Sequence, residues 1–355
     1  MTTSSATHST TPKIAQPPMG LRDAFHRMVS GRPLADTMDA AVRTGPGSPH
    51  FAPFPAPCAS AGNSVVDVLA AGVNPVDIAI AAGTFPGVVP TYPSVVGHGG
   101  VGILDGRRVY FNGPIAPYGS MAQQVLLAPE RTVELPDGID DGAAVALGTA
   151  GMAGWLALSW RARLEPGETV LVLGATGVLG AVAVQAARIL GAGRVVAAGR
   201  NAPGLRRLAA LGADATVDVS AGSPAGSPDR RDLPAAFRKA AGGGVDVIID
   251  PVWGEQALAA LQAASPFARL VQIGNAGSPT AGIPAGVIRR FSASILGYTN
   301  LMVPAADRAA GYASMAGHAA AGRLAVDVEH LPLSQVRTAW ALQNAVPHRK
   351  LVLVP

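Results

Sequence analysis

The chain has 355 residues, of which 49% are hydrophobic and 14% are charged, and it contains 43 glycines and 30 prolines. This composition fits a compact enzyme better than a disordered or fibrous chain, and the length suffices for two domains with separate cores. The net charge is +4, but the basic residues are scattered and no basic run is interleaved with aromatic residues, so we expect no nucleic acid among the partners.

The chain has one cysteine, Cys58, which excludes an intramolecular disulfide and a cysteine-rich metal site. Such cysteine usage fits a reducing compartment, and because the first dozen residues lack the apolar stretch of a signal peptide, we expect a cytoplasmic protein. Two windows without charge, Gly142 to Trp160 and Thr169 to Ala187, raise the question of a membrane. Glycines interrupt both windows, so we predict buried core and no membrane span.

Residues 1–37 form a predicted extension. Its first part, Met1 to Pro18, is rich in serine, threonine and proline and is typical of a disordered segment, whereas apolar spacing predicts a short amphipathic helix from Met19 to Gly31. From Met38 to Glu134, short apolar segments alternate with turns, which predicts a β-rich domain. The predicted strands begin at Met38 and then cover Ser64 to Ala70, Gly100 to Leu104, Arg107 to Phe111 and Met121 to Leu127.

From Asp140 to Arg163 the pattern turns helical and apolar, and beyond it strands alternate with helices. The predicted strands are Thr169 to Leu173, Arg194 to Ala198, Ala215 to Val219, Val245 to Asp250, Arg269 to Ile273 and Ser294 to Gly297. Helices are predicted after the first of these strands and at Pro203 to Leu211, Leu233 to Ala241 and Gly254 to Ala264, with a loop at Ser220 to Asp229. Six strands alternating with helices predict an α/β fold with a doubly wound parallel sheet.

The tail of the chain, Pro304 to Pro355, contains two predicted helices and a final strand. The helices are Ala305 to Ala321 and Leu333 to Asn344, and the strand is Lys350 to Val354. This tail is too long for a simple cap, so we expect it to return to the β-rich domain.

A glycine-rich turn follows the strand at Thr169 to Leu173 and opens an alanine-rich helix, with the spacing G-x-x-G-x-x-G. In a strand, turn and helix unit such a turn lets backbone N–H groups and the positive helix end approach a pyrophosphate. We therefore predict a dinucleotide site, the alternative being a purely structural turn. The turn residues predicted to bind the cofactor are Gly174, Ala175, Thr176, Gly177, Val178 and Gly180.

The end of the next strand indicates which dinucleotide binds. An NAD site usually places an acidic residue there to hold the ribose hydroxyl, whereas this chain has Gly199, Arg200 and Asn201. A guanidinium suits a 2′-phosphate, so we predict NADPH over NADH, unless Arg200 is only a solvated loop charge. Three further residues are predicted at the cofactor because they end later strands at the carboxyl edge of the sheet, namely Asp250, Gly274 and Tyr298.

Seven segments, taken together in this order, match a known family. They are Ala71 to Asp77 with Gly83 to Phe85, Pro93 to Gly102, Leu135 to Gly138, Leu164 to Val172 with the glycine turn, Leu211 to Ala215, Gly244 to Asp250 and Leu270 to Gly274. Over residues 38–355 the chain resembles the zinc-independent quinone oxidoreductases, which are zeta-crystallin-like members of the medium-chain dehydrogenase/reductase superfamily. The resemblance implies a Rossmann domain at 161–300 and a GroES-like catalytic domain formed by both chain ends, 38–160 and 301–355. It also implies hydride transfer from NADPH and a homodimer.

The chain departs from its relatives at several positions. Asn74 and Pro75 stand where zinc-dependent relatives place ligands, and His98 remains with Gly99 beside it. A catalytic zinc needs three protein ligands, so we expect no metal. Many quinone reductases have Arg and Tyr where this chain has Ala81 and Phe85, which leaves open how a quinone would be held.

Without a metal, the protein must supply hydrogen-bond donors where negative charge develops on the acceptor after hydride addition, and a side chain or water must then supply a proton. The catalytic candidates are Asn74, Asp77, Tyr92 and His98. Asn74 is a donor to substrate or ribose, or else it closes an Asx-type turn with Asp77. Tyr92 is an O–H donor or a packing aromatic, and His98 is a proton relay or a structural histidine.

Together with the resemblance, these residues lead us to expect an NADPH-dependent, metal-independent reductase that transfers hydride to a quinone or an α,β-unsaturated carbonyl. Two alternatives stay open. One is an enoyl-thioester reductase, although no basic cluster for a phosphopantetheine arm is evident in the sequence. The other is a weakly catalytic NADPH-binding protein of the zeta-crystallin type.

Overall fold

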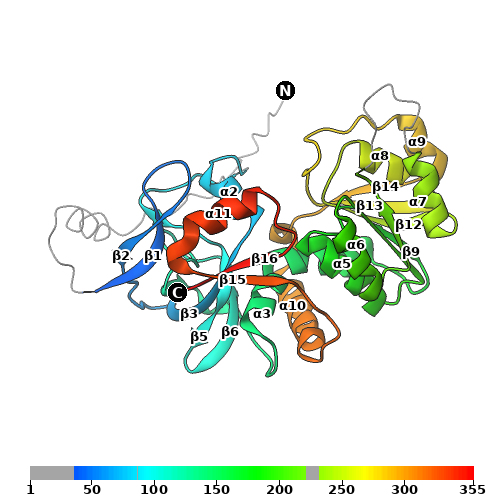
Figure 1. Ribbon diagram of the computed structural model, residues 1–355. Coiled ribbons are helices and arrows are strands. Elements are labelled where there is room, and N and C mark those ends of the chain that lie inside the picture. Colours follow the sequence, from blue (N-terminus) through cyan, green and yellow to red (C-terminus); the bar gives the residue numbers. More distant parts are fainter. Residues whose placement is uncertain (1–35, 86, 221–231) are drawn as a thin grey trace, which may run out of the picture.

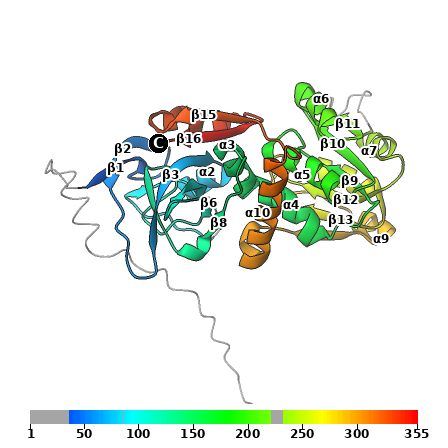
Figure 2. The same cartoon turned by 90° about the horizontal axis from the view of Figure 1, so that it is seen from below.

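The computed structural model describes residues 36–85, 87–220 and 232–355. The predicted disordered segment, the helix predicted at Met19 to Gly31 and most of the loop predicted at Ser220 to Asp229 lie outside the described residues. Two parts follow one another along the longest dimension of the molecule, a β-rich part and a part built on a parallel sheet (Figures 1 and 2).

The parallel sheet has six strands in the order β11-β10-β9-β12-β13-β14, and every neighbouring pair is parallel. The strands are β9 (Thr169–Val172), β10 (Arg194–Gly199), β11 (Ala215–Asp218), β12 (Val245–Asp250), β13 (Ala264–Gln272) and β14 (Ser294–Gly297). The chain therefore winds outward from β9 in both directions, which confirms the predicted doubly wound α/β fold. The central strands β9, β10 and β12 are almost fully buried, because helices cover both faces of such a sheet.

Strand β13 begins five residues earlier than predicted, at Ala264 instead of Arg269. The pairing of β12 with β13 shifts register between Val245 and Val247, and Phe267 takes a left-handed φ of 64° with its ring 76% exposed. A bulge of this kind breaks the alternation from which strands are predicted, so the sequence pattern showed only the second half of the strand.

Helices connect the strands of the parallel sheet. They are α5 (Val178–Ile189), α6 (Ala202–Ala210), α7 (Leu233–Ala241), α8 (Glu255–Gln262) and α9 (Ala285–Phe291). Side-chain caps define two of the starts, because Asn201 Oδ1 accepts from Gly204 N and Asp232 Oδ1 accepts from Ala235 N. Helix α9 was not predicted, and its seven residues are too few to show a clear helical period.

The β-rich part holds a three-stranded sheet, β2-β1-β4, and a seven-stranded sheet, β15-β16-β3-β5-β6-β8 with β7 paired to β3. The strands are β1 (Thr37–Arg43), β2 (His50–Pro55), β3 (Ser64–Val73), β4 (Ser94–Val95), β5 (Gly99–Leu104), β6 (Arg107–Asn112), β7 (Gln124–Leu127), β8 (Thr132–Glu134), β15 (Val328–Pro332) and β16 (Lys350–Val354). Between β7 and β8 lies the turn η1 (Pro129–Arg131).

Two longer strands that the sequence did not predict lie at sheet edges. Strand β2 contains Pro53 and Pro55, and β15 ends at Pro332. Both strands pair with a neighbouring strand on one side only. Proline is tolerated at such an edge because it lacks the backbone N–H that a second neighbouring strand would need.

The last strand returns to the first part of the chain. Strand β16 pairs antiparallel with β3, with Leu351 opposite Val73 and Leu353 opposite Ala71. Before it lie η4 (Asn300–Met302), α10 (Ala305–Ala320), η5 (Leu333–Gln335) and α11 (Val336–Asn344). One sheet therefore contains strands from both chain ends, whereas the predicted boundaries at residues 37, 160 and 300 stay predictions.

The apolar segment between the sheets is one bent helical stretch. It consists of α3 (Asp141–Ala146), η2 (Leu147–Gly151), α4 (Met152–Leu156) and η3 (Ala157–Ala162), and it bends at Gly148, where ψ is −105°. In the described part of the chain this is the one helix long and apolar enough to cross a membrane, and 78% of its most apolar window is buried inside the protein. Burial of this extent is typical of a core helix.

Helix α4 packs closely on α5 at Gly154. A Cβ added to Gly154 would lie 2.7 Å from Leu179 O and 3.1 Å from Ala183 N, which are backbone atoms of α5. We predict that Gly154→Ala lowers the free energy of unfolding by about 1–3 kcal/mol, because the helices must separate. Unfolding by urea measures this.

A matched control lies on α10. Nothing lies within 4 Å of a Cβ added to Gly317, so Gly317→Ala should raise stability by about 0.5–1 kcal/mol through helix propensity. Equal effects of the two substitutions would contradict the close approach of α4 to α5.

Candidate functional site

The glycine turn lies at the point where the winding of the parallel sheet reverses. Strand β9 has β10 on one side and β12 on the other, and the turn leads from β9 into α5 at Val178. In open α/β sheets ligands bind in the crevice at such a reversal, beyond the carboxyl ends of the strands. The first N–H groups of α5 have no partner within the helix and point toward this crevice.

Two of the three glycines are required by geometry. Gly174 has a left-handed φ of 59°, and a Cβ on Gly180 would lie 2.5 Å from both Gly174 O and Ala175 Cα. A Cβ on Gly177 would meet only Gly174 O at 3.6 Å, an ordinary contact. The protein itself would accommodate a side chain at Gly177, so the glycine there leaves the mouth of the turn open for a ligand.

The turn after β9 and the turn after β10 contact each other at Thr176, which is buried. A Cβ added to Gly199 or Gly204 would lie 3.0 or 2.9 Å from the Thr176 methyl group, so the turn after β10 rests directly on this residue. Ala175 N also donates to Ala198 O at 2.9 Å. The predicted cofactor residues of the two turns therefore form one surface.

The end of β10 has the arrangement expected from the sequence. Arg200 directly follows the strand and its side chain is exposed. Asn201 is engaged in capping α6 through its Oδ1. Of these two side chains, Arg200 is the one free to meet a ligand phosphate.

Two predicted residues shape the loop after β12. Asp250 is fully buried, and its Oδ1 accepts from the N–H groups of Val252 and Trp253, both at 2.8 Å. Burial raises the pKa of Asp250, while these two N–H donors lower it. A Cβ on Gly274 would lie 3.0 Å from Pro251 O, so this glycine lets the chain after β13 pass the same loop. Both residues support the rim of the crevice.

Tyr298 connects the parallel sheet to the bent helical stretch. Its O–H donates to Asn300 Oδ1 at 2.7 Å, and Asn300 Nδ2 donates to Thr149 O at 2.9 Å. Burial raises the pKa of Tyr298 well above its ordinary value. The hydroxyl is thus a neutral, bonded donor that sets the position of η2.

Asn74 and Asp77 start helix α2 (Pro75–Ala81), which the sequence did not predict. Asp77 Oδ2 accepts from Asn74 N at 2.8 Å and from Asn74 Nδ2 at 2.9 Å, and Nδ2 also lies 3.3 Å from Gly72 O. Of the two roles that the sequence left open, these bonds favour the local turn, because the amide donors of Asn74 are used inside the protein. Its role toward a ligand stays a prediction.

The third member of this cluster is Lys350, which sequence reasoning missed. Its side chain is buried, and Nζ donates to Val73 O at 2.8 Å and to Asn74 Oδ1 at 2.5 Å. A Cβ on Gly72 would lie 2.9 Å from this Nζ, so a glycine is needed where the lysine passes. The signal in the sequence was a lysine at the start of an otherwise apolar strand.

Burial dominates the electrostatics of the cluster. It raises the pKa of Asp77, which His98, Asn74 and Lys350 oppose in that order. Burial lowers the pKa of Lys350 to about 8, and the nearby Asp77 carboxylate raises it. Burial thus disfavours both the carboxylate form of Asp77 and the ammonium form of Lys350.

His98 and Asp77 line one pocket of the β-rich part, together with Arg43 of β1. His98 is half-buried, whereas the Arg43 side chain is buried. Tyr92 lies outside this pocket, and the Arg43 guanidinium sits over its ring, 4.9 Å from the centroid. The structure thus brings Asn74, Asp77 and His98 together and places Tyr92 as an aromatic contact of Arg43.

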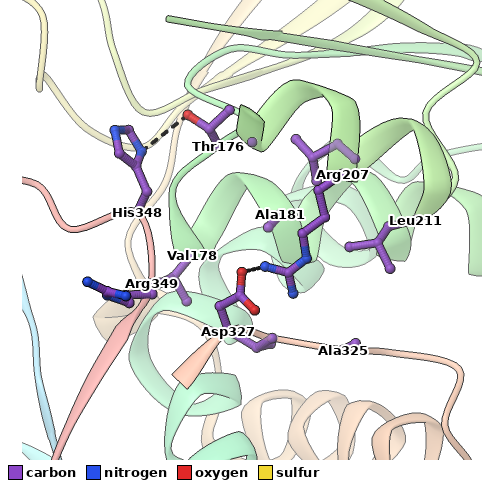
Figure 3. A pocket seen from close by; sticks show the side chains of 12 residues that line it. Thr176, Val178, Ala181, Arg207, Leu211, Ala325, Asp327, His348 and Arg349 are labelled. Atoms are coloured by element: carbon purple, nitrogen blue, oxygen red, sulfur yellow. Dashed lines mark hydrogen bonds and ion pairs between the residues drawn. The ribbon is translucent and has the colours of Figure 1, made fainter. Parts of the chain in front are cut away.

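A second pocket lies beside the glycine turn (Figure 3). It is lined by Thr176 and Arg207 from the parallel-sheet part and by Asp327, His348 and Arg349 from the tail of the chain. His348 Nδ1 lies 3.3 Å from Thr176 Oγ1, and Arg207 forms an ion pair with Asp327. Sequence reasoning missed His348, because nothing local marks a residue that meets a turn 172 positions away.

Known dehydrogenases and quinone oxidoreductases are similar to this chain in sequence. Residues 178–309 match the model of the zinc-binding dehydrogenase family. The quinone oxidoreductase of Pseudomonas aeruginosa is 32% identical over 232 residues, which span 62% of this chain and 67% of that protein. The chain belongs to the quinone oxidoreductase-like members of the medium-chain dehydrogenase/reductase superfamily.

Other members of the superfamily are similar in sequence or fold. Quinone oxidoreductase-like protein 2 of Mus musculus is 29% identical over 184 residues, 50% of its length, so the chain spans about half of that relative. The quinone oxidoreductase of Thermus thermophilus, solved alone and with NADPH, superposes with a TM-score of 0.75 at 28% identity, covering 90% of this chain and 100% of that one. A putative NADPH:quinone reductase of Bacillus thuringiensis shares the fold, with a TM-score of 0.77 at 19% identity over 90% and 100% of the two chains.

Although the matching family model is described as zinc-binding, this member lacks a set of zinc ligands in its described part. Within residues 36–85, 87–220 and 232–355, no group of three or more His, Cys, Asp or Glu side chains could hold a metal ion. Cys58 is exposed, and the charged residues that line the pocket together with His98 are Asp77 and Arg43.

The buried amine makes a testable contribution to stability. Between about pH 8 and about pH 10.4 the unfolded chain binds a proton at Lys350 that the folded chain releases, so the free energy of unfolding rises with pH in this window. We predict that wild type gains up to about 3 kcal/mol relative to Lys350→Met across this window and nothing below it. Urea unfolding at a series of pH values measures the difference in free energy of unfolding between wild type and Lys350→Met. The titration of tyrosines contributes equally to both proteins and cancels in this difference. Parallel pH profiles would contradict a depressed lysine pKa.

Proposed function

We propose that this protein is an NADPH-dependent reductase that transfers hydride to a quinone or an α,β-unsaturated carbonyl without a metal. The observation that carries the proposal is the glycine turn at the sheet reversal, with exposed Arg200 where an NAD site has an acidic residue. The pocket of Asp77 and His98 supplies polar groups for the acceptor.

The turn fits a dinucleotide on steric grounds. A side chain at Gly177 would fit the protein yet fill the mouth of the turn, and the free N–H groups of α5 face a bound pyrophosphate. The exposed guanidinium of Arg200 then supplies parallel donors for a 2′-phosphate. The relative from Thermus thermophilus, solved with NADPH, supports the same choice of cofactor.

NADPH, when bound, supplies the hydride, and the protein must stabilise the oxygen that becomes negative on the acceptor. His98 is a half-buried donor in a pocket bordered by Val95 and Val96. In the same cluster, Lys350 Nζ donates to Asn74 Oδ1 and Asn74 Nδ2 donates to Asp77 Oδ2, so Asn74 links the amine to the carboxyl group. In this proposal His98 donates a hydrogen bond to the acceptor oxygen, and the linked groups of Asp77, Asn74 and Lys350 lie beside it.

A homodimer through the last strand of the parallel sheet also belongs to this proposal. Strand β14 is an edge strand, and Ser294, Ile295 and Gly297 are exposed. The neighbouring η4 adds exposed Leu301 and Met302. An apolar edge of this kind favours pairing with a second copy.

Cofactor choice is tested at Arg200. We predict that Arg200→Asp weakens NADPH binding about 10- to 100-fold, because hydrogen bonds to charged groups contribute about 1.5–3 kcal/mol and the new carboxylate repels phosphate. NADH, which lacks the phosphate, should lose far less. Titration of both cofactors by calorimetry gives the two ratios.

The control is Arg337→Asp, the same charge change on an exposed residue in the first turn of α11. It should leave both affinities unchanged. The role of Arg200 is wrong if its substitution weakens the two cofactors equally, or if Arg337→Asp produces the same preference.

A further inference from the structure

Arg43 is a buried cation that has no ion-pair partner among the described residues. It ends β1 with 5% of its surface exposed, and it lines the pocket of Asp77 and His98. Within residues 36–85, 87–220 and 232–355, no carboxylate forms an ion pair with it. Burial lowers the pKa of Arg43, yet a guanidinium stays protonated in proteins.

The guanidinium uses only part of its hydrogen-bonding capacity. Nη1 donates to Ile80 O at 3.3 Å and Nη2 donates to Ser94 Oγ at 3.4 Å, both long bonds, and buried Nε has no partner among the described residues. A guanidinium has five N–H groups, so three donors remain. Nε–H and the adjacent Nη–H point in parallel, the arrangement that binds both oxygens of a carboxylate.

A buried, unpaired charge opposes folding unless something compensates it. The ring of Tyr92 compensates part, through its contact with the guanidinium. The carbonyl of Ile80 and the hydroxyl of Ser94 add only long hydrogen bonds, and the side chains of Val95 and Val96 in the pocket wall offer no polar group. Arg43 is therefore a cation to which a bound anionic ligand can supply the missing hydrogen bonds and opposite charge.

We propose that Arg43 binds a carboxylate of the acceptor, so that the substrate is a quinone or enone that carries a carboxylate. This inference rests on the proposed function. The fork of Arg43 donates to the two carboxylate oxygens, which leaves the conjugated carbonyl of the same small molecule for His98 in the same pocket. Asp77 also lines the pocket, which disfavours a doubly charged phosphate more than a singly charged carboxylate.

The test compares two acceptors with the same conjugated ketone, trans-3-acetylacrylate, which carries a carboxylate, and its methyl ester, which is uncharged. We expect Arg43→Met to lower kcat/KM for the acid about 10- to 100-fold, as for a lost charged pair, and to change the ester less than about 3-fold. NADPH affinity should not change. Equal losses with acid and ester would overturn the proposal and leave Arg43 as a structural residue.

The matched control is Arg108→Met. Arg108 lies in the same part of the protein and pairs with Asp141 and Ile139 O, away from the pocket. It should affect acid and ester alike. Should Arg43→Met not fold, Arg43→Lys keeps the charge without the fork, and a loss confined to the acid supports the proposal, whereas equal effects overturn it.

A binding experiment separates this inference from the reductase activity. Levulinate, the saturated analogue, cannot accept a hydride at a double bond, and calorimetry of the NADPH-loaded protein measures its affinity. Levulinate binding that Arg43→Met abolishes supports the carboxylate site even if no acceptor is turned over. Reduction of the ester together with levulinate binding that is weak, or unchanged in Arg43→Met, would overturn the site while the proposed function stands.

Discussion

The buried amine of Lys350 is the constraint on which the candidate site depends. It lies where β3 ends and α2 begins, bonded to Val73 O and to the side chain of Asn74. Asn74 in turn holds the carboxylate of Asp77. Because β16 pairs with β3, the end of the chain holds residues from its first third in place, and the polar wall of the proposed acceptor pocket depends on that pairing.

The same short segment also meets the cofactor turn. His348 contacts Thr176 of the glycine turn, and Lys350, two residues later, contacts the start of α2. Both Val346 and His348 have left-handed φ values, 55° and 56°, which are uncommon for residues other than glycine and strained for a β-branched side chain such as that of Val346. The chain thus maintains a strained turn where the two halves of the proposed site meet, which is where backbone strain is commonly found in enzymes.

Local patterns predicted much of this molecule, and long-range contacts account for what they missed. The strand, glycine turn and helix at Thr169 to Ile189 formed as predicted, because the apolar strand, the glycine turn and the alanine-rich helical segment follow one another directly in the sequence. The proline-containing edge strand β2 and the bulged start of β13 break their own periodicity. The sequence named Asp77 and His98, but it did not show Arg43 and Lys350 beside them, since each comes from a distant strand.

The central claim is hydride transfer from NADPH to a conjugated acceptor. The most direct measurement uses NADPH deuterated at the transferable position of the nicotinamide, with a small enone, and mass spectrometry of the product. We predict a saturated ketone with deuterium at the β carbon, since that carbon receives the hydride. Tight binding of NADPH with neither a deuterated ketone from enones nor a hydroquinone from quinones would contradict it.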